Sequence, residues 1–177
     1  MNKNNLIHLI LSLIAFVLAY SIAYLTGIDL VKQVVLYAFL IQWVLFIPAY
    51  IFQTEKFYDL SGSFTYIFVI CYVSYSFYLE NGINIGNIIL GGAIIIWAIR
   101  LGSFLFFRIH NAGEDKRFRN IKPSATRFFM TWTLQGMWVS ICSACALTAI
   151  STSKGVQVNS LLYVGLAFFL IGFLIEV

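Results

Sequence analysis

Long, predominantly apolar stretches constrain the fold of this chain more than any other feature. Four of them reach about 20 residues, the length that a helix needs to cross a hydrocarbon layer about 30 Å thick. They are Leu6–Leu25, Val34–Phe52, Ile88–Phe107 and Phe128–Ile150. Two shorter runs, Phe64–Leu79 and Leu161–Ile175, reach this length when their flanks are included. The core of a soluble protein does not require runs of this kind.

These runs predict a membrane protein built from helices. Hydrophobic residues make up 61% of the chain, above the roughly 45–50% apolar content of soluble domains. Backbone groups in lipid must be satisfied internally, and no run alternates as the strands of a barrel do. The run Leu6–Leu25 exceeds the 7–15 apolar residues of a signal peptide, so we expect it to be retained. The prediction is an all-α integral membrane protein with about six transmembrane helices in one bundle, forming a single domain over residues 1–177.

A basic hairpin, Arg108–Arg127, carries six of the eleven lysine and arginine residues. With six spans, the N-terminus, the loop 53–63 and this hairpin share one side and hold eight positive residues. The other side holds only Lys32 and Lys154. Because cytoplasmic loops carry the excess of lysine and arginine, we predict that the N-terminus and the 108–127 hairpin are cytoplasmic.

Arg100 is the only charged residue well inside a predicted span, about 10 Å from the cytoplasmic end of its helix. Such residues usually face a bundle interior, a partner or a cavity; the alternative is snorkelling toward the interface. Because Arg108 follows two turns later, we expect both guanidinium groups to line one basic pocket that opens to the cytoplasm and suits phosphate oxygens.

The hairpin is not uniformly basic, because Glu114 and Asp115 interrupt it. An anchor for lipid headgroups needs only lysine and arginine, and that role remains the alternative. Mixed charges suit recognition of a nucleotide, with carboxylates binding ribose hydroxyls and arginines binding phosphates. No cluster of histidine, cysteine and carboxylate with the spacing of metal ligands is present, so we predict no metal site.

The loop Phe57–Ser63 contains Asp59 followed by two serines. The favoured interpretation is that Ser61 or Ser63 caps the next helix. The alternative is that Tyr58 and Asp59 serve proton transfer or hydrogen bonding beside the basic hairpin.

Small residues recur every fourth position at Gly136, Ser140, Ala144 and Thr148. This spacing places them on one face of a helix, where they allow another helix to approach closely. We therefore expect this ridge to be a packing surface rather than a site.

Four sequence blocks together resemble a bacterial membrane family, domain of unknown function 1295, a relative of the steroid 5-alpha-reductases. The blocks are Phe57–Ser63, Arg100–Arg108, Gly113–Phe118 and Trp132–Val139. The resemblance extends from about residue 30 to the last residue. It implies a protein of the bacterial inner membrane that acts on a lipid-like small molecule in the bilayer and binds no nucleic acid.

The resemblance also implies an activity: reduction of a conjugated double bond in a lipid-like or steroid-like enone by hydride from NADPH. The cofactor-binding residues that it implies are Arg100, Arg108, Asp115 and Arg117. In the steroid reductases a tyrosine three residues before the arginine polarises the substrate ketone. Trp97 occupies that position here, and an indole does not donate a phenolic proton.

Two alternatives to the reductase remain open. One is a membrane methyltransferase related to the isoprenylcysteine methyltransferases, and the other is a non-enzymatic membrane remnant. The resemblance implies that relatives continue past the sixth helix into an Arg-His-Pro-Asn-Tyr block and a final helix. Because this sequence stops at Glu176-Val177, we expect an N-terminal portion of a steroid-reductase-like fold, with impaired catalysis.

Overall fold

Helices form all the regular secondary structure in the computed structural model, which describes residues 3–175. Glu176 and Val177, the final residues of the sequence, lie outside the described range. The elements are α1 (Lys3–Leu25), α2 (Asp29–Ile51), α3 (Tyr58–Asn81), α4 (Ile85–Ala112), the short 3₁₀ helix η1 (Lys116–Asn120), α5 (Ala125–Ser151) and α6 (Ser160–Ile175). The predicted all-α bundle with about six membrane helices is confirmed.

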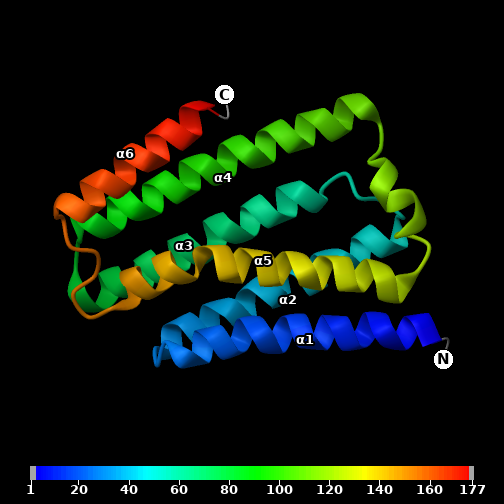
Figure 1. Ribbon diagram of the computed structural model, residues 1–177, viewed down its shortest axis with the longest axis horizontal. Coiled ribbons are helices and arrows are strands. Elements are labelled where there is room, and N and C mark those ends of the chain that lie inside the picture. The colour runs from blue at the N-terminus through cyan, green and yellow to red at the C-terminus, as the bar shows by residue number, and fades with distance from the viewer. Residues whose placement is uncertain (1–2, 176–177) are drawn as a thin grey trace.

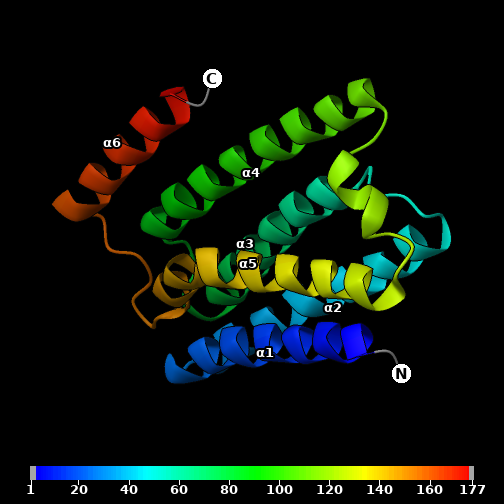
Figure 2. The ribbon, with the colours of Figure 1, turned by 45° about the vertical axis from the view of Figure 1, so that its right-hand side comes forward.

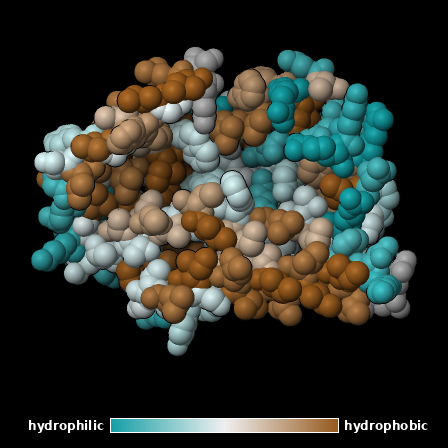
Figure 3. All heavy atoms as spheres, in the orientation of Figure 1, coloured by the Kyte–Doolittle hydropathy of each residue, from teal (hydrophilic) through white to brown (hydrophobic). Residues whose placement is uncertain are grey.

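Five of the helices, α1 to α5, are long and apolar enough to cross a membrane. The sixth helix, α6, has 16 residues, which corresponds to about 24 Å at 1.5 Å per residue. Large apolar side chains on the outside of the bundle are exposed, such as Leu13 at 62% and Phe104 at 63%. Figure 3 shows such side chains over much of the molecule, with hydrophilic side chains gathered at its right-hand end. This surface suits a bilayer.

The helices form one closely packed group and one more loosely packed group (Figures 1 and 2). Among α1, α2, α3 and α5, every pair of helices is in contact except α1 and α3, and α4 packs mainly against α3. Within the described residues, α6 contacts α4 alone and buries none of its side chains. The helix α6 is therefore the most loosely packed part of the bundle.

Small side chains explain the close packing among α1, α2, α3 and α5. The buried face of α1 consists of Ser12, Ala15, Ala19 and Ala23. On α5, a Cβ atom at Gly136 would lie 3.0 Å from the ring of Phe39 on α2. Ser140 is also buried, and Ala144 and Thr148 are half-buried. The ridge predicted from the four-residue spacing is therefore a packing surface, as expected.

The helices extend beyond the apolar runs that predict them. The run Ile88–Phe107 becomes α4, which ends five residues later at Ala112. Gly113 ends it with a positive φ of 79°, a conformation that favours glycine. At the other side of the hairpin, the Ser124 hydroxyl accepts a hydrogen bond from the Arg127 N–H and caps α5. The hairpin itself is thus residues 113–124, because apolar runs mark only the part of a helix that lies in hydrocarbon.

The connections lie at two ends of the bundle (Figure 1). The hairpin end holds the start of α1, the α2–α3 loop (52–57) and the hairpin 113–124. The opposite end holds the connections 26–28, 82–84 and 152–159. The excess of lysine and arginine therefore gathers at the hairpin end, as the alternation of six spans predicts.

Gly86, at the start of α4, offers a test of the packing at the opposite end. A Cβ atom there would lie 2.0 Å from the carbonyl oxygen of Val156, whereas one at Gly92 meets nothing within 4 Å. We expect Gly86→Ala to lower the free energy of unfolding by about 1–3 kcal/mol. Gly92→Ala is expected to raise it by up to about 1 kcal/mol, because alanine is the better helix former. Thermal unfolding in detergent compares the two, and equal midpoints would contradict the close contact at Gly86.

Candidate functional site

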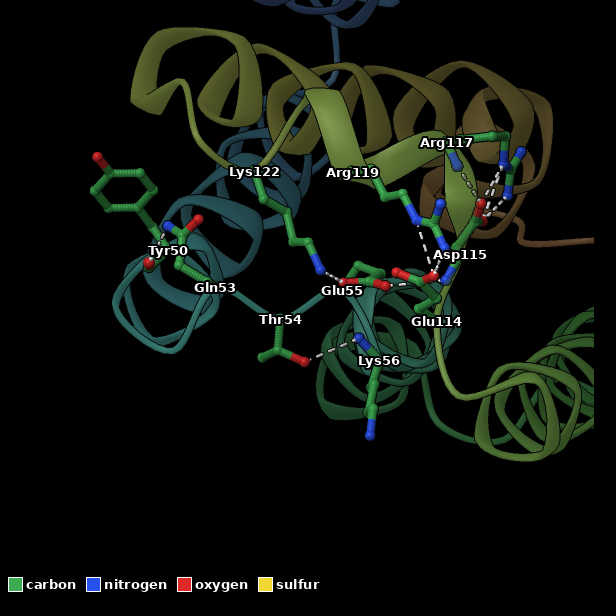
Figure 4. Close-up of polar contacts among 10 residues, drawn as sticks. All are labelled: Tyr50, Gln53, Thr54, Glu55, Lys56, Glu114, Asp115, Arg117, Arg119 and Lys122. Atoms are coloured by element: carbon green, nitrogen blue, oxygen red, sulfur yellow. Dashed lines mark hydrogen bonds and ion pairs between the residues drawn. The ribbon is translucent and has the colours of Figure 1, made fainter.

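A buried carboxylate joins the α2–α3 loop to the hairpin (Figure 4). Glu55 is only 2% exposed. One of its oxygens accepts a hydrogen bond of 2.9 Å from the backbone N–H of Asp115, and the other pairs with the ammonium group of Lys122. Glu55 therefore binds the hairpin at two points, one before η1 and one after it.

Two ion pairs order the first half of the hairpin (Figure 4). The Asp115 carboxylate accepts hydrogen bonds from the backbone N–H and the guanidinium of Arg117, at 2.9 and 3.0 Å. The Arg119 guanidinium pairs with the Glu114 carboxylate. Each arginine lowers the pKa of its carboxyl partner through these hydrogen bonds, so both acids stay ionised at neutral pH.

Phe118 anchors η1 to the bundle. Its side chain is 5% exposed, and its ring lies 5.1 Å from the ring of Tyr58 and 6.1 Å from that of Phe128. Trp132, fully buried one turn further along α5, completes this aromatic cluster. The hairpin is therefore held by a buried ring as well as by Glu55.

A groove of about 400 Å³ lies where α4 meets the hairpin. We call it the basic groove; charged residues line it, together with Ile109 and Ala112. They are Arg108, Glu114, Asp115, Lys116 and Arg117. Three of the four predicted cofactor-binding residues, Arg108, Asp115 and Arg117, therefore lie together. Within the described residues Arg108 and Lys116 belong to no ion pair, which leaves their charges available to an anion.

Arg100 lies elsewhere, and the prediction that it shares one pocket with Arg108 is wrong. Its guanidinium carbon lies 4.8 Å from the ring centroid of Phe173 on α6, a cation–π contact. The basic groove includes Arg108 but not Arg100. Eight residues along a helix correspond to a rise of about 12 Å and a rotation of about 80°, which turns the two side chains to different neighbours. A role of Arg100 in cofactor binding stays a prediction.

A second cavity, of about 510 Å³, lies between α3 and α4 on the membrane side of the basic groove. We call it the apolar slot; Phe64 and Ile67 of α3 and Ile99 and Gly102 of α4 are among its lining. The helices approach closely here, because a Cβ atom at Gly102 would lie 2.5 Å from the Ser63 hydroxyl. Gly102, which lines the slot, and Ile109, which lines the groove, lie on the same face of α4 about 10 Å apart along its axis, so the slot and the groove are neighbours along this helix.

The start of α3 corrects the interpretation of the Phe57–Ser63 loop. The helix begins at Tyr58 without a side-chain cap, and Phe57 occupies the N-cap position. Ser61 lies inside the first turn and donates to the Tyr58 carbonyl at 2.6 Å. The capping prediction is wrong because the helix begins six residues before its apolar run. The Tyr58 hydroxyl donates to the Thr131 carbonyl at 3.0 Å, so it ties α3 to α5.

Three side chains that make polar contacts between elements, Glu55, Gln42 and Gln135, were not predicted from the sequence. Glu55 is one acid in a polar loop, and no spacing distinguishes it. Gln42 is fully buried in α2 and donates to the Thr65 hydroxyl at 2.7 Å. Gln135 of α5 donates to the Tyr58 carbonyl at 3.0 Å. The sequence did contain a signal for Gln42, because it is an amide inside an apolar run, and in a membrane such a group needs a buried partner.

Trp97 lies beside a phenol from another helix. The ring of Tyr66 on α3 meets that of Trp97 edge-on, with centroids 5.3 Å apart. Trp97 of α4 is therefore adjacent to a tyrosine supplied by α3.

Comparison with known proteins identifies the family. The family described as "Protein of unknown function (DUF1295)" matches residues 45–177. The chain belongs to DUF1295. No curated protein and no solved structure matches it. The match begins in α2, so the part of this DUF1295 chain that it covers includes Glu55 and all the lining residues of the basic groove and the apolar slot.

Proposed function

We propose that this DUF1295 protein is a membrane-embedded reductase that uses NADPH to saturate the conjugated double bond of a lipid-like or steroid-like enone. The observation that carries the proposal is the adjacency of a basic groove and an apolar slot along the last turns of α4. The resemblance of four sequence blocks to the steroid 5-alpha-reductase relatives supports the same chemistry.

The basic groove fits the phosphate-bearing part of NADPH. Within the described residues Arg108 and Lys116 belong to no ion pair, and Arg108 presents a planar fork of donors to phosphate oxygens. Asp115 is already bound by Arg117, and this ion pair holds the Arg117 guanidinium beside Asp115 in the lining of the groove. When bound, the coenzyme supplies a hydride; with one proton it converts the enone to the saturated ketone and leaves NADP⁺.

The apolar slot fits the other reactant. Phe64, Ile67 and Ile99 offer an apolar lining, and the hydroxyls of Ser63 and Ser103 add a few polar atoms. Ligand sites commonly combine a mostly apolar wall with a small number of polar groups. A substrate that dissolves in the bilayer enters such a slot without crossing water.

We also propose that the hairpin end faces the cytoplasm of a bacterial inner membrane, because eight of the positive residues gather there. Reporter tags inserted in residues 82–84 are expected to be accessible from outside, and tags in residues 113–124 only from inside. Both insertions lie in connections between helices. Reversed accessibility of the two tags would refute the orientation.

One assay separates the reductase from its alternatives. The purified protein is titrated with NADPH, and coenzyme oxidation is followed with progesterone and with 3-nonen-2-one as enones. Saturable NADPH binding and enone-dependent oxidation support the proposal. Retention of a labelled methyl donor without NADPH binding would favour the methyltransferase. Binding of neither compound would favour a non-enzymatic membrane protein.

A further inference from the structure

Most carboxylates at the hairpin end already have a cation as partner (Figure 4). The pairs are Asp115 with Arg117, Glu114 with Arg119, and Glu55 with Lys122. Within the described residues Arg108 and Lys116 lie outside these pairs. The charge of Asp59, at the start of α3, interacts with that of Arg108. Arg108, Lys116 and Asp59 thus carry two positive charges and one negative charge, and this balance favours an anion in the basic groove.

The apolar slot opens sideways, between α3 and α4, toward the outside of the bundle. Phe64 of α3 and Ile99 of α4 both line it, and each is 53% exposed. Leu60, one turn before Phe64, is also an exposed residue of the lining. Because the exposed apolar surface of the bundle faces lipid, acyl chains of the bilayer reach the slot directly.

An apolar strip on α4 joins the slot to the basic groove. It begins at Gly102 in the lining of the slot and ends at Ile109 in the lining of the groove. Leu105 and Phe106 lie between them on the same face of the helix, and both are half-buried. A molecule with a chain in the slot and an anionic group in the groove therefore meets apolar side chains between the two.

An anionic phospholipid has this distribution of charge and apolar surface. Its phosphate lies in a headgroup layer that adds about 5–8 Å on each side of the hydrocarbon core, and its acyl chains lie directly below. Basic pockets between transmembrane helices on the cytoplasmic side bind such headgroups. A zwitterionic phospholipid would instead bring an ammonium group close to Arg108 and Lys116, so the charge of the groove selects against it.

We propose that the basic groove and the apolar slot together bind an anionic phospholipid from the leaflet at the hairpin end, with its phosphate at Arg108 and Lys116 and one acyl chain in the slot, in competition with NADPH. The phospholipid is distinct from the proposed substrate, because it carries no enone and its headgroup occupies the coenzyme groove. The lipid site rests on charge and shape alone, whereas the competition rests on the proposed coenzyme binding. The anionic lipid content of the membrane then sets the apparent affinity for NADPH.

Photochemical labelling of the full chain in phosphatidylcholine vesicles tests the lipid site. The probe is a phosphatidylglycerol that carries a diazirine on one acyl chain, and the matching phosphatidylcholine probe is the control. Peptide mass spectrometry locates the adducts, which we expect in residues 60–67 of α3 and 98–103 of α4. Unlabelled phosphatidylglycerol is expected to displace the probe. Glycerol 3-phosphate, which has the phosphate without the chains, is expected to displace it far less.

Charge variants test the headgroup contact. Arg108→Ala and Lys116→Ala should each lower the adduct yield in the slot about fivefold, which is the contribution of one basic residue near an anionic lipid surface. Asp59→Asn should raise the yield, because it removes the negative charge that interacts with Arg108. Lys154→Ala, at the opposite end, should leave it unchanged.

A bulky side chain in the slot tests the contact with the acyl chain. Ser103 lines the slot and is exposed, so Ser103→Trp is expected to fill part of the slot and to lower the adduct yield several-fold. Ile96→Trp is the matched control, because Ile96 is exposed on the same helix but outside the lining.

Titration with NADPH in the same vesicles tests the competition. We expect the apparent Kd for NADPH to rise as the fraction of phosphatidylglycerol increases. Repulsion of NADPH by the anionic surface would raise it equally in Ser103→Trp. A smaller rise in Ser103→Trp than in the wild-type chain is therefore the result expected from a shared site.

Two results would overturn the lipid site: equal adduct yields from the two probes, or a yield that Arg108→Ala and Lys116→Ala leave unchanged. Adducts with the expected charge dependence but without NADPH binding would contradict the proposed coenzyme site and leave the lipid site standing. NADPH binding that phosphatidylglycerol leaves unaltered would refute the competition and leave the proposed reductase standing.

Discussion

Replacement of Glu55 by alanine is expected to lower the free energy of unfolding by about 3–5 kcal/mol. The change leaves the Lys122 ammonium, whose side chain is 18% exposed, without its carboxylate. It also removes the acceptor of the Asp115 N–H. Breaking a buried ion pair by removing one partner leaves an uncompensated charge, which costs more than the pair itself contributes. Denaturant unfolding in detergent measures the loss.

Two further variants give this prediction its controls. Glu55→Gln keeps an acceptor for the Asp115 N–H but loses the ion pair, so an intermediate loss is expected. Glu80→Ala removes an exposed acid at the opposite end and is expected to change the free energy of unfolding by less than about 0.5 kcal/mol. Trypsin cleavage in the 113–124 hairpin should quicken in Glu55→Ala alone. Equal stability of Glu55→Ala and Glu80→Ala would show that the buried carboxylate does not hold the hairpin.

Removal of the cations of the basic groove is expected to have the largest effect on coenzyme binding. Arg108→Ala and Lys116→Ala should each weaken NADPH binding about tenfold or more, because a hydrogen bond to a charged group contributes about 1.5–3 kcal/mol. Fluorescence titration with NADPH measures the affinity. Lys154→Ala, which removes a positive charge at the opposite end, should leave it unchanged.

Arg100→Ala is the informative contrast in the same titration. Its guanidinium packs on Phe173 of α6 rather than in the basic groove, so we expect a smaller loss than in Arg108→Ala. An equal loss would favour the binding role that the family resemblance predicts for Arg100. Unchanged affinity in Arg108→Ala and Lys116→Ala would remove the support for coenzyme binding in the groove.

The fold was predictable because the bilayer imposes a simple requirement on sequence. Runs of about 20 apolar residues need helices, and the six runs correspond to α1 to α6. The ends of the helices were less predictable, because α3 and α4 continue beyond their apolar runs into polar residues at the interface. At these positions the local backbone conformation ends the helix, as the positive φ of Gly113 ends α4.

Site residues that lie close together in the sequence can be predicted from it, whereas residues far apart in the sequence are joined only by the fold. Arg108, Asp115 and Arg117 lie within ten residues of one another, and a tight turn brings them to one groove. Glu55 and Lys122 are 67 residues apart, and only the packing of the α2–α3 loop on the hairpin joins them.

Hydrogen exchange of the full chain with and without NADPH, read by mass spectrometry, tests most directly whether the groove holds the coenzyme. We predict that NADPH slows exchange of backbone amides in residues 108–120, where the end of α4 and η1 form the groove. Peptides from residues 26–28 and 152–159 should not change. Unaltered exchange across residues 108–120 at saturating NADPH would contradict the account.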